Sequence, residues 1–367
     1  RLILRIRTEM GGKDFGDWGW RIPFLLSAIL LAVSVWIRLK LNESPLFKRM
    51  VEEGKQSKRP LGEAFGQWSN AKIAIAALLG ATAGEAVVWY GGQFYALFFL
   101  TQTLKVPAVT AWIMIAVSLA IGTPCFILFG WLSDKIGRKP IMLAGFALAV
   151  VTYFPIFGGL THFANPKLEH ALSASPVTVT ADPSQCSFQF KATGTETFTT
   201  ACDIIKSTLV NLSVNYENIK APAGTKASVK IGDTQLNADT SNLPAAIAAA
   251  VKAHGYPASA DPKDINYPMT VLLLAILVVY VTMVYGPIAA WLVELFPTRI
   301  RYSGLSLPYH IGNGWFGGFL PATVFAIVAA TGNIYSGLWY PIVIAAMSFV
   351  VGLIFLPETK DRNITTM

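Results

Sequence analysis

One ionisable side chain, Glu85, lies near the centre of a long apolar stretch, residues 73–100. In hydrocarbon an ionised carboxylate costs at least about 2.5–3.5 kcal/mol on insertion scales, so such a group should face a cavity, bind a partner or be protonated. Because burial disfavours the charged form, a carboxyl group here is a candidate proton carrier. The alternative is a neutral structural glutamic acid that is hydrogen-bonded to a neighbouring helix.

Aromatic and polar side chains follow Glu85 in the same stretch. Helical spacing would put Glu85, Trp89 and Gly92 on one face, and the Gly91-Gly92 pair would weaken the helix there. A single aromatic residue usually packs in a core, but the set indicates a cavity lining. A second apolar stretch adds a histidine that can titrate near neutral pH or serve as a structural hydrogen-bonding group. The candidate pathway residues are Glu85, Trp89, Tyr90, Gln93, Tyr95, His310 and Asn313.

A short charged loop, Gly130-Trp-Leu-Ser-Asp-Lys-Ile-Gly-Arg-Lys139, separates two other apolar stretches. An acid and several bases this close can form a charge-assisted latch that breaks when helices rock. We expect Gly130 to allow close helix approach and Gly137 to permit the tight reversal. Simple anchoring at the membrane interface is the alternative. The candidate latch residues are Gly130, Asp134, Lys135, Gly137, Arg138 and Lys139.

Glu294 lies near the end of a further apolar stretch and five residues before Arg299. We expect it to pair with Arg299 or Arg301 as part of a gate. The alternative is an interfacial ion pair with no gating role, since exposed pairs contribute little.

The composition of the chain indicates which kind of structure holds these residues in place. Hydrophobic residues make up 53% of the 367 residues and charged residues 14%, whereas soluble domains carry about 25% charged residues. A membrane helix needs about 20 apolar residues, and helices are expected because lipid leaves no water for an open backbone. The alternation of a membrane barrel is absent. Seven stretches are predicted to span: 22–37, 73–100, 106–131, 141–163, 269–295, 303–330 and 338–356.

The net charge of +8 reflects topology rather than nucleic-acid binding. Lys and Arg cluster in the segments 38–72, 135–139, 299–301 and 360–362, at the ends of alternate spans, which marks these loops as cytoplasmic. The N-terminus is then outside and the C-terminus inside. Arg1, Arg5, Arg7 and Lys13 are a local exception to this charge bias.

A polar insert, about residues 164–267, separates the fourth and fifth spans and is expected on the extracytoplasmic side. Alternation predicts strands at 177–180, 187–190 and 228–231, and an Ala-rich pattern predicts a helix over 242–254. Cys186 and Cys202 are either a disulfide in an oxidising compartment or two free thiols.

Other classes of function lack support in the sequence. The segment 312–317 matches a dinucleotide-binding pattern without the strand–helix unit that the pattern requires; we interpret Gly314 and Gly318, like Gly80 and Gly84, as small residues in helix packing. Zinc-protease, phosphate-loop and serine-hydrolase motifs are absent. We therefore predict no enzyme, no metal and no cofactor. A seven-helix receptor is the alternative of another class, although the last span has no lysine for a retinal.

The 130–139 loop resembles the signature of the major facilitator superfamily, in its C-terminal copy. The segments 18–24, 43–47, 294–304 and 357–359 are similar to those of metabolite:proton symporters, which include α-ketoglutarate, shikimate, citrate and proline/betaine carriers. The resemblance implies alternating access with substrate near the bilayer midplane. A sugar-porter relative is the alternative within this class.

The resemblance also implies an all-α membrane protein: a major facilitator fold fragment with seven transmembrane helices, numbered six to twelve. The small extracytoplasmic β-rich insert is a departure from the family, whose members usually have a short loop there. Helices one to five would be missing, and the chain alone is expected not to transport. The expected partners are a small-molecule substrate, protons and the lipid bilayer of a bacterial-type inner (plasma) membrane, with no nucleic acid. The implied parts are the end of helix five with its loop (1–21), helix six (22–39), a central cytoplasmic loop (40–71), helices seven to nine (72–163), the insert (164–267), helices ten to twelve (268–357) and a cytoplasmic tail (358–367).

Overall fold

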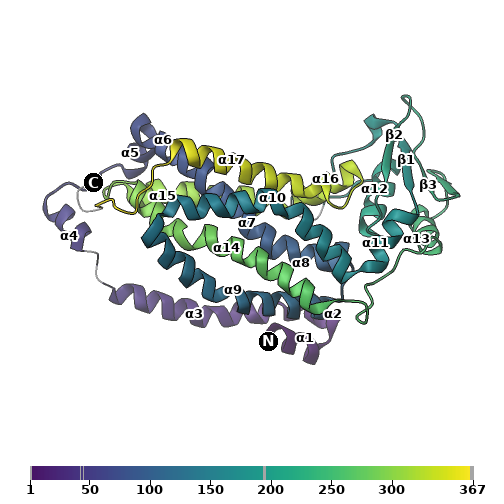
Figure 1. Cartoon of the computed structure of the whole chain (residues 1–367), viewed down its shortest axis with the longest axis horizontal. Helices are drawn as coiled ribbons and strands as arrows, with labels where there is room; N and C mark the ends of the chain where they lie inside the picture. The colour runs from purple at the N-terminus through teal and green to yellow at the C-terminus, as the bar shows by residue number, and fades with distance from the viewer. Residues whose placement is uncertain (1, 42, 44, 193–195, 364–367) are drawn as a thin grey trace. The chain divides into compact units, whose positions relative to one another are not determined.

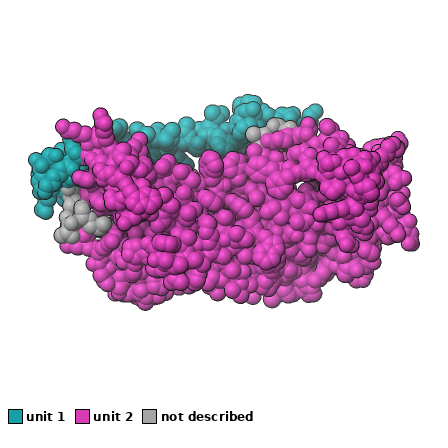
Figure 2. All heavy atoms as spheres, turned by 90° about the horizontal axis from the view of Figure 1, so that it is seen from above, with its two compact units in different colours: residues 1–56 teal, residues 57–367 magenta. Residues whose placement is uncertain are grey.

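The computed structural model describes residues 2–41, 43, 45–192 and 196–363. The chain divides into two compact units, residues 1–56 and 57–367, which Figure 2 distinguishes by colour. Arg1, part of the 43–47 segment (Ser44) and the end of the predicted tail (364–367) lie outside the described residues.

The first unit is helical. Its elements are α1 (Leu2–Met10), α2 (Gly12–Asp14), the π-helical η1 (Phe15–Gly19), α3 (Arg21–Lys40) and α4 (Pro45–Glu52). The predicted span 22–37 lies inside an apolar helical stretch, Phe15–Lys40, that begins seven residues earlier than expected. Helix α3 has no buried residue, and its exposed Phe24 and Leu30 are the kind of surface that lipid covers.

The second unit contains six more helical stretches long and apolar enough to cross a membrane, which makes seven in the described part of the chain. Each matches a predicted span, with ends that differ by a few residues. These stretches are Trp68–Thr103 (α6, η2, α7, η3, α8 and η4), Ala108–Ile136 (α9), Arg138–Ala164 (α10), Tyr267–Leu295 (α14), Arg301–Thr331 (α15, η6 and α16) and Ser336–Phe355 (η7 and α17). A short helix, α5 (Pro60–Gly66), precedes them.

Helix 68–103 is interrupted by π-helical turns at Leu78–Thr82, Gly91–Tyr95 and Phe99–Thr103. The middle one begins at the Gly91-Gly92 pair, where the sequence predicts a weakened helix. Such turns are rare and are frequent at functional sites. The first two flank α7 (Ala83–Tyr90), the segment that carries Glu85.

Residues 164–267 form a small α/β body at one end of these helices (Figure 1). It contains α11 (Pro166–Ala174), β1 (Val177–Ala181), η5 (Pro183–Gln185), α12 (Ala201–Asn211), β2 (Glu217–Lys220), β3 (Ser228–Ile231), β4 (Thr234–Asn237) and α13 (Leu243–Ala253). The strand order is β2-β1-β3-β4. Strands β1 and β2 are parallel, the other pairs are antiparallel, and Val179 faces Val229. Alternate β1 residues are buried, as the sequence pattern predicts.

The second predicted strand, 187–190, is wrong. This segment is an irregular loop. The Asp203 carboxylate accepts hydrogen bonds from the Ser187 amide (2.7 Å) and hydroxyl (2.9 Å), and Cys186 is disulfide-bonded to Cys202. The loop is therefore held by α12 rather than by a neighbouring strand, and its alternation does not follow burial, since Phe188 is exposed and Gln189 is buried.

The α/β body caps the ends of two membrane helices. The Tyr216 amide donates to the Gly332 carbonyl (2.7 Å) and its hydroxyl to the Ala329 carbonyl (2.5 Å). The Asn165 side chain donates to the Leu104 carbonyl (2.9 Å). These contacts satisfy carbonyl groups that a helix end leaves without partners, so the body and helices 68–103 and 301–331 are joined at this end.

Glycines set the closest helix contacts, as expected for membrane helices. A Cβ atom added at Gly80 would lie 2.8 Å from the Gly352 nitrogen, and one at Gly84 would lie 2.5 Å from the Ser348 Cβ. These two positions therefore pack on α17, as predicted. The expectation for Gly314 and Gly318 is wrong, because an added Cβ would meet nothing at Gly314 and only the local backbone at Gly318. Gly312 instead approaches Thr82.

The close contact at Gly84 predicts that the same substitution, Gly→Ala, has different effects on stability at two positions. Gly84→Ala should lower the apparent melting temperature, since overpacking costs about 1–3 kcal/mol. Gly158→Ala adds the same methyl group in the interior of α10, where an added Cβ meets nothing within 4 Å, and should leave the melting temperature unchanged or slightly higher. Equal melting curves for the two variants in detergent would contradict this packing.

Candidate functional site

The Glu85 side chain lies between two membrane helices, fully buried. Its Oε2 atom accepts a hydrogen bond from Asn313 Nδ2 (3.1 Å), and the same nitrogen donates to the Tyr309 carbonyl (3.2 Å). The Oε1 atom has no hydrogen-bond partner among the described residues. Since an ionised oxygen without a partner is costly in a buried site, this oxygen is the place for a proton or for a ligand donor.

Aromatic side chains surround this pair. Tyr309 lies one turn before Asn313 on the same helix, and its ring contacts that of His310 edge-on (ring centroids 5.8 Å). Trp89 contacts Tyr90 edge-on (ring centroids 5.0 Å) and stacks on Tyr285 (6.4 Å). Tyr285 comes from α14 and is 39% exposed. The cluster thus extends from a buried carboxyl group to a partly exposed tyrosine.

Four predicted pathway residues, Glu85, Trp89, Tyr90 and Asn313, lie in or beside this cluster. Tyr95 does not: its ring is buried against Phe157 (5.4 Å) and Phe99 (6.0 Å). Gln93 is half-buried two turns along the helix from Glu85, and His310 is exposed beside Tyr309. Tyr285 and Tyr309 were not predicted in the site, because isolated tyrosines in an apolar stretch carry no local signal.

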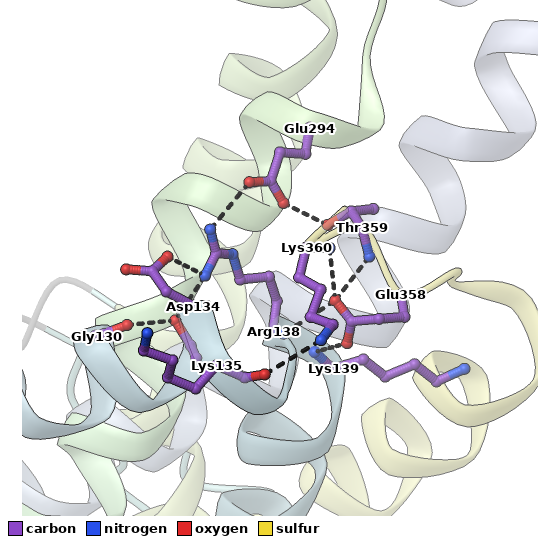
Figure 3. Close-up of polar contacts among 10 residues, drawn as sticks. Gly130, Asp134, Lys135, Arg138, Lys139, Glu294, Glu358, Thr359 and Lys360 are labelled. Carbon is purple, nitrogen blue, oxygen red and sulfur yellow. Dashed lines mark hydrogen bonds and ion pairs between the residues drawn. The ribbon is translucent and has the colours of Figure 1, made fainter. Parts of the chain in front are cut away.

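Arg138, the first residue of α10, is the centre of a second polar cluster (Figure 3). Helix α10 begins at the end of the helices opposite the α/β body (Figure 1). The Arg138 guanidinium group forms ion pairs with Asp134 and with Glu294 Oε1 (3.1 Å from Nη2), and donates to Ser133 Oγ (3.1 Å). Glu294 Oε2 accepts from the Thr359 hydroxyl (2.5 Å). This charge-assisted network links α9, α10, α14 and the segment after α17.

Glu358 holds the backbone of the 130–139 loop. Its carboxylate accepts the amides of Arg138 (3.1 Å), Lys139 (3.0 Å), Thr359 (2.7 Å) and Lys360 (2.9 Å). Burial alone would raise the pKa of this carboxyl group, but these amide donors outweigh it and the pKa lies below the ordinary 4.5. Gly137 has φ +116°, and an added Cβ would lie 2.7 Å from Glu358 Cδ, so the predicted reversal at Gly137 is present and needs glycine.

The remaining latch residues have lesser roles. The Lys139 ammonium group donates to the Leu353 and Leu356 carbonyls (both 2.7 Å). The Lys135 side chain is exposed, and its carbonyl accepts from Lys360 Nζ (3.2 Å). An added Cβ at Gly130 meets nothing within 4 Å, so the lack of a side chain at Gly130 is not what allows the neighbouring helix α14 to approach there. The glycine that approaches is Gly286, which packs on the Gly130 backbone nitrogen.

The predicted partners of Glu294 are also wrong. Arg299 pairs with Glu63 (3.3 Å), and Arg301 donates from Nε to the Phe296 carbonyl (3.1 Å). The chain turns after Phe296, so arginines close in sequence point elsewhere while Arg138 reaches Glu294 from a neighbouring helix. Ser133, Glu358 and Thr359 were not predicted in this cluster. An acidic residue directly after the last apolar stretch, at the end where the basic loop lies, is the signal that points to Glu358.

The Arg138–Glu294 pair predicts a large stability effect. Their side chains are 9% and 13% exposed, and removing one partner of a buried pair costs about 3–5 kcal/mol. Glu294→Gln should therefore lower the apparent melting temperature strongly. Asp239→Asn removes one partner of the exposed Lys226–Asp239 pair. This change should leave the apparent melting temperature the same within error. Equal effects of the two changes would show that Glu294 is not engaged.

Glu358 predicts a pH dependence. Its carboxyl pKa is lower in the folded protein than the ordinary 4.5, so its contribution is present above that value and is lost as pH falls through the folded pKa. Between about pH 6 and about pH 3 the wild type should lose more thermal stability than Glu358→Gln, which starts lower at neutral pH. Parallel pH profiles would contradict the role of this carboxylate.

Comparisons with known proteins match two parts of the chain to families of transporters. The model of the Major Facilitator Superfamily matches residues 15–164, and that of Sugar (and other) transporter matches residues 243–367; most of the α/β body lies between them. The chain is 32% identical to the alpha-ketoglutarate permease of Escherichia coli over 45% of this chain and 37% of the permease. It is 30% identical to the shikimate transporter of Escherichia coli over 43% of this chain and 36% of the transporter.

A relative from Haemophilus influenzae is 27% identical over 98% of this chain and 59% of its own length. The chain thus spans about a third to just over half of these relatives. No solved structure was found to match it. The matched families and named relatives are transport proteins and not enzymes. With its seven apolar helical stretches, the chain is a multi-pass membrane protein, and its residues 15–164 match the major facilitator superfamily.

Proposed function

We propose that this chain forms part of a secondary active transporter that carries a small organic acid or zwitterion together with protons by alternating access. The observation that carries the proposal is the buried Glu85 carboxyl group, with one oxygen bound to Asn313 and the other without a partner among the described residues. The relatives named for α-ketoglutarate and shikimate support an organic acid as substrate.

The site suggests how proton and substrate are coupled. When Glu85 is protonated it is neutral and can remain buried without an ion partner. Deprotonation leaves a charge that needs water or a cationic or hydroxyl donor, which an opened cavity would supply. Glu85 and Asn313 belong to different membrane helices, so movement of these helices would change the surroundings of the carboxyl group and could release its proton.

The Arg138 cluster would act as the latch of one conformation. The proposed topology places it, the segment 40–71 and the tail from residue 358 in the cytoplasm, and the α/β body outside an inner membrane. Because the network joins four chain segments, opening this end of the bundle requires its ion pairs to break. The seven helices would correspond to helices six to twelve of a complete carrier, and the other half of the cavity would come from helices one to five.

A sugar is the second candidate substrate, because the family model that matches residues 243–367 is that of sugar and other transporters. Neutral sugars need hydrogen-bonding side chains rather than a cation in the cavity. Counterflow of labelled α-ketoglutarate, shikimate, betaine and glucose into proteoliposomes that contain the complete gene product distinguishes these classes.

Glu85→Gln tests the coupling. With one proton per substrate, a gradient of one pH unit supplies about 1.4 kcal/mol and drives about tenfold accumulation. The variant should lose this accumulation and keep exchange of labelled for unlabelled substrate, because the amide retains the shape and the bond to Asn313 but cannot carry a proton. Glu169→Gln, in the α/β body, is the control and should accumulate normally. Unchanged accumulation by Glu85→Gln would remove this residue from coupling.

A further inference from the structure

A cavity of about 820 Å³ lies where the α/β body meets two membrane helices. The end of helix 68–103 contributes Thr101, Gln102 and Lys105, and the loop after the disulfide contributes Gln189 and Lys191. Helix α16 supplies an apolar wall that includes Phe325. The cavity therefore has a polar side and an apolar side, and it is distinct from the Glu85 cluster.

The distance along the helix separates the two sites. Thr101 is sixteen residues after Glu85, which corresponds to about 24 Å at 1.5 Å per residue. A molecule beside Thr101 would not touch Glu85, whereas Gly318, on the other side of the cavity, donates its amide to the Asn313 carbonyl (2.8 Å). The cavity lies instead at the end of the same two helices that carry those residues.

The charges of the cavity lining are positive. Lys105 and Lys191 are its ionisable residues, and its described lining contains no Asp or Glu. Neither lysine forms an ion pair in the described part of the chain: Lys105 Nζ donates to the Asn211 carbonyl (2.6 Å), and Lys191 lies 5.9 Å from the centre of the Phe198 ring. Two cations beside hydroxyl and amide groups form a surface suited to an anion.

Lys105 is held in an unusual conformation. Its φ is +56°, which is uncommon for a residue with a side chain and tends to occur at functional sites. Its carbonyl accepts from the Ala260 amide (3.0 Å), so the α/β body fixes its backbone. Burial lowers the pKa of its ammonium group, and a bound anion would offset that effect by favouring the charged form.

The position of Lys191 depends on the disulfide loop. The Gln189 side chain donates from Nε2 to the Asp203 carbonyl (2.9 Å), next to the Cys186–Cys202 disulfide. Phe190 packs on Phe319 of the helix 301–331 stretch (ring centroids 5.9 Å). The residues before Lys191 are thus anchored both to α12 and to a membrane helix.

We propose that this cavity binds a small organic carboxylate, with the carboxylate between Lys105 and Lys191 and the carbon skeleton against the α16 wall. The inference rests on the proposed function, which places the cavity on the outer side of the membrane. There the cavity would bind an anionic substrate before the substrate reaches the central site around Glu85. A local positive site raises the concentration and the arrival rate of an anion.

Residue-specific labelling tests the site without any variant. The complete protein in detergent is acetylated briefly with an amine-reactive ester, with and without α-ketoglutarate, and each lysine is followed by mass spectrometry. α-Ketoglutarate should protect Lys105 and Lys191 in a saturable manner and leave Lys230 and Lys252, on the same α/β body, unprotected. No protection, or equal protection of all four lysines, would overturn the proposal, as would equal protection by sodium chloride at matched ionic strength.

Two variants separate this site from the central one. Lys191→Gln should raise the substrate concentration for half-maximal transport several-fold with little change in the maximal rate, whereas Lys230→Gln should change neither. Transport without lysine protection overturns the carboxylate site and leaves the proposed function standing. Lysine protection without transport overturns the proposed function and retains the site. Replacement of Cys186 and Cys202 by serine should weaken protection at Lys191 more than at Lys105.

Discussion

The inability of hydrocarbon to solvate charge is the constraint on which this structure depends. In the larger unit the charged groups lie mainly at the two ends of the helices, where each end has its own polar assembly. One end carries the Arg138–Glu294 network and the other carries the α/β body with Lys105. Glu85 is the exception, because it lies deep in a membrane helix with Asn313 as its partner. A carboxyl group that is buried at such a cost in free energy has a function or a very good hydrogen-bond partner. In Glu85 one oxygen still lacks a partner among the described residues.

The three assemblies are connected through the same helices. Helix 68–103 carries Glu85 in its middle and Lys105 just beyond its end, and its glycines let α17 approach closely. The segment after α17 then supplies Glu358 and Thr359 to the Arg138 network. Helix 301–331 carries Asn313 and ends at the carbonyls that Tyr216 caps. A change of conformation at the Glu85 cluster would therefore be transmitted along rigid elements to both ends of the bundle.

Sequence patterns predicted what depends on local composition. The apolar stretches, the weak helix at Gly91-Gly92, the reversal at Gly137 and the isolation of Glu85 all follow from residues close together in the chain. The patterns failed where a partner is distant: Glu294 binds Arg138 and not Arg299, and residues 187–190 are held by Asp203 and not by a strand. A residue close in sequence is the partner that a local pattern suggests. A turn at the end of a helix can direct the side chain of that residue away, as it does for Arg299. The cavity beside Lys105 had no local signal, since four separate segments form it.

The most direct test is the side of the membrane on which the two polar ends lie. In a background with Cys125 replaced by alanine, single cysteines at exposed Lys135 and Lys230 are treated in intact cells with a membrane-impermeant maleimide. The proposed threading predicts that Lys230→Cys reacts from outside, whereas Lys135→Cys reacts only after the membrane is permeabilised. Reaction of both cysteines from the same side would contradict the arrangement of the helices and, with it, the assignment of an outer cavity and an inner latch.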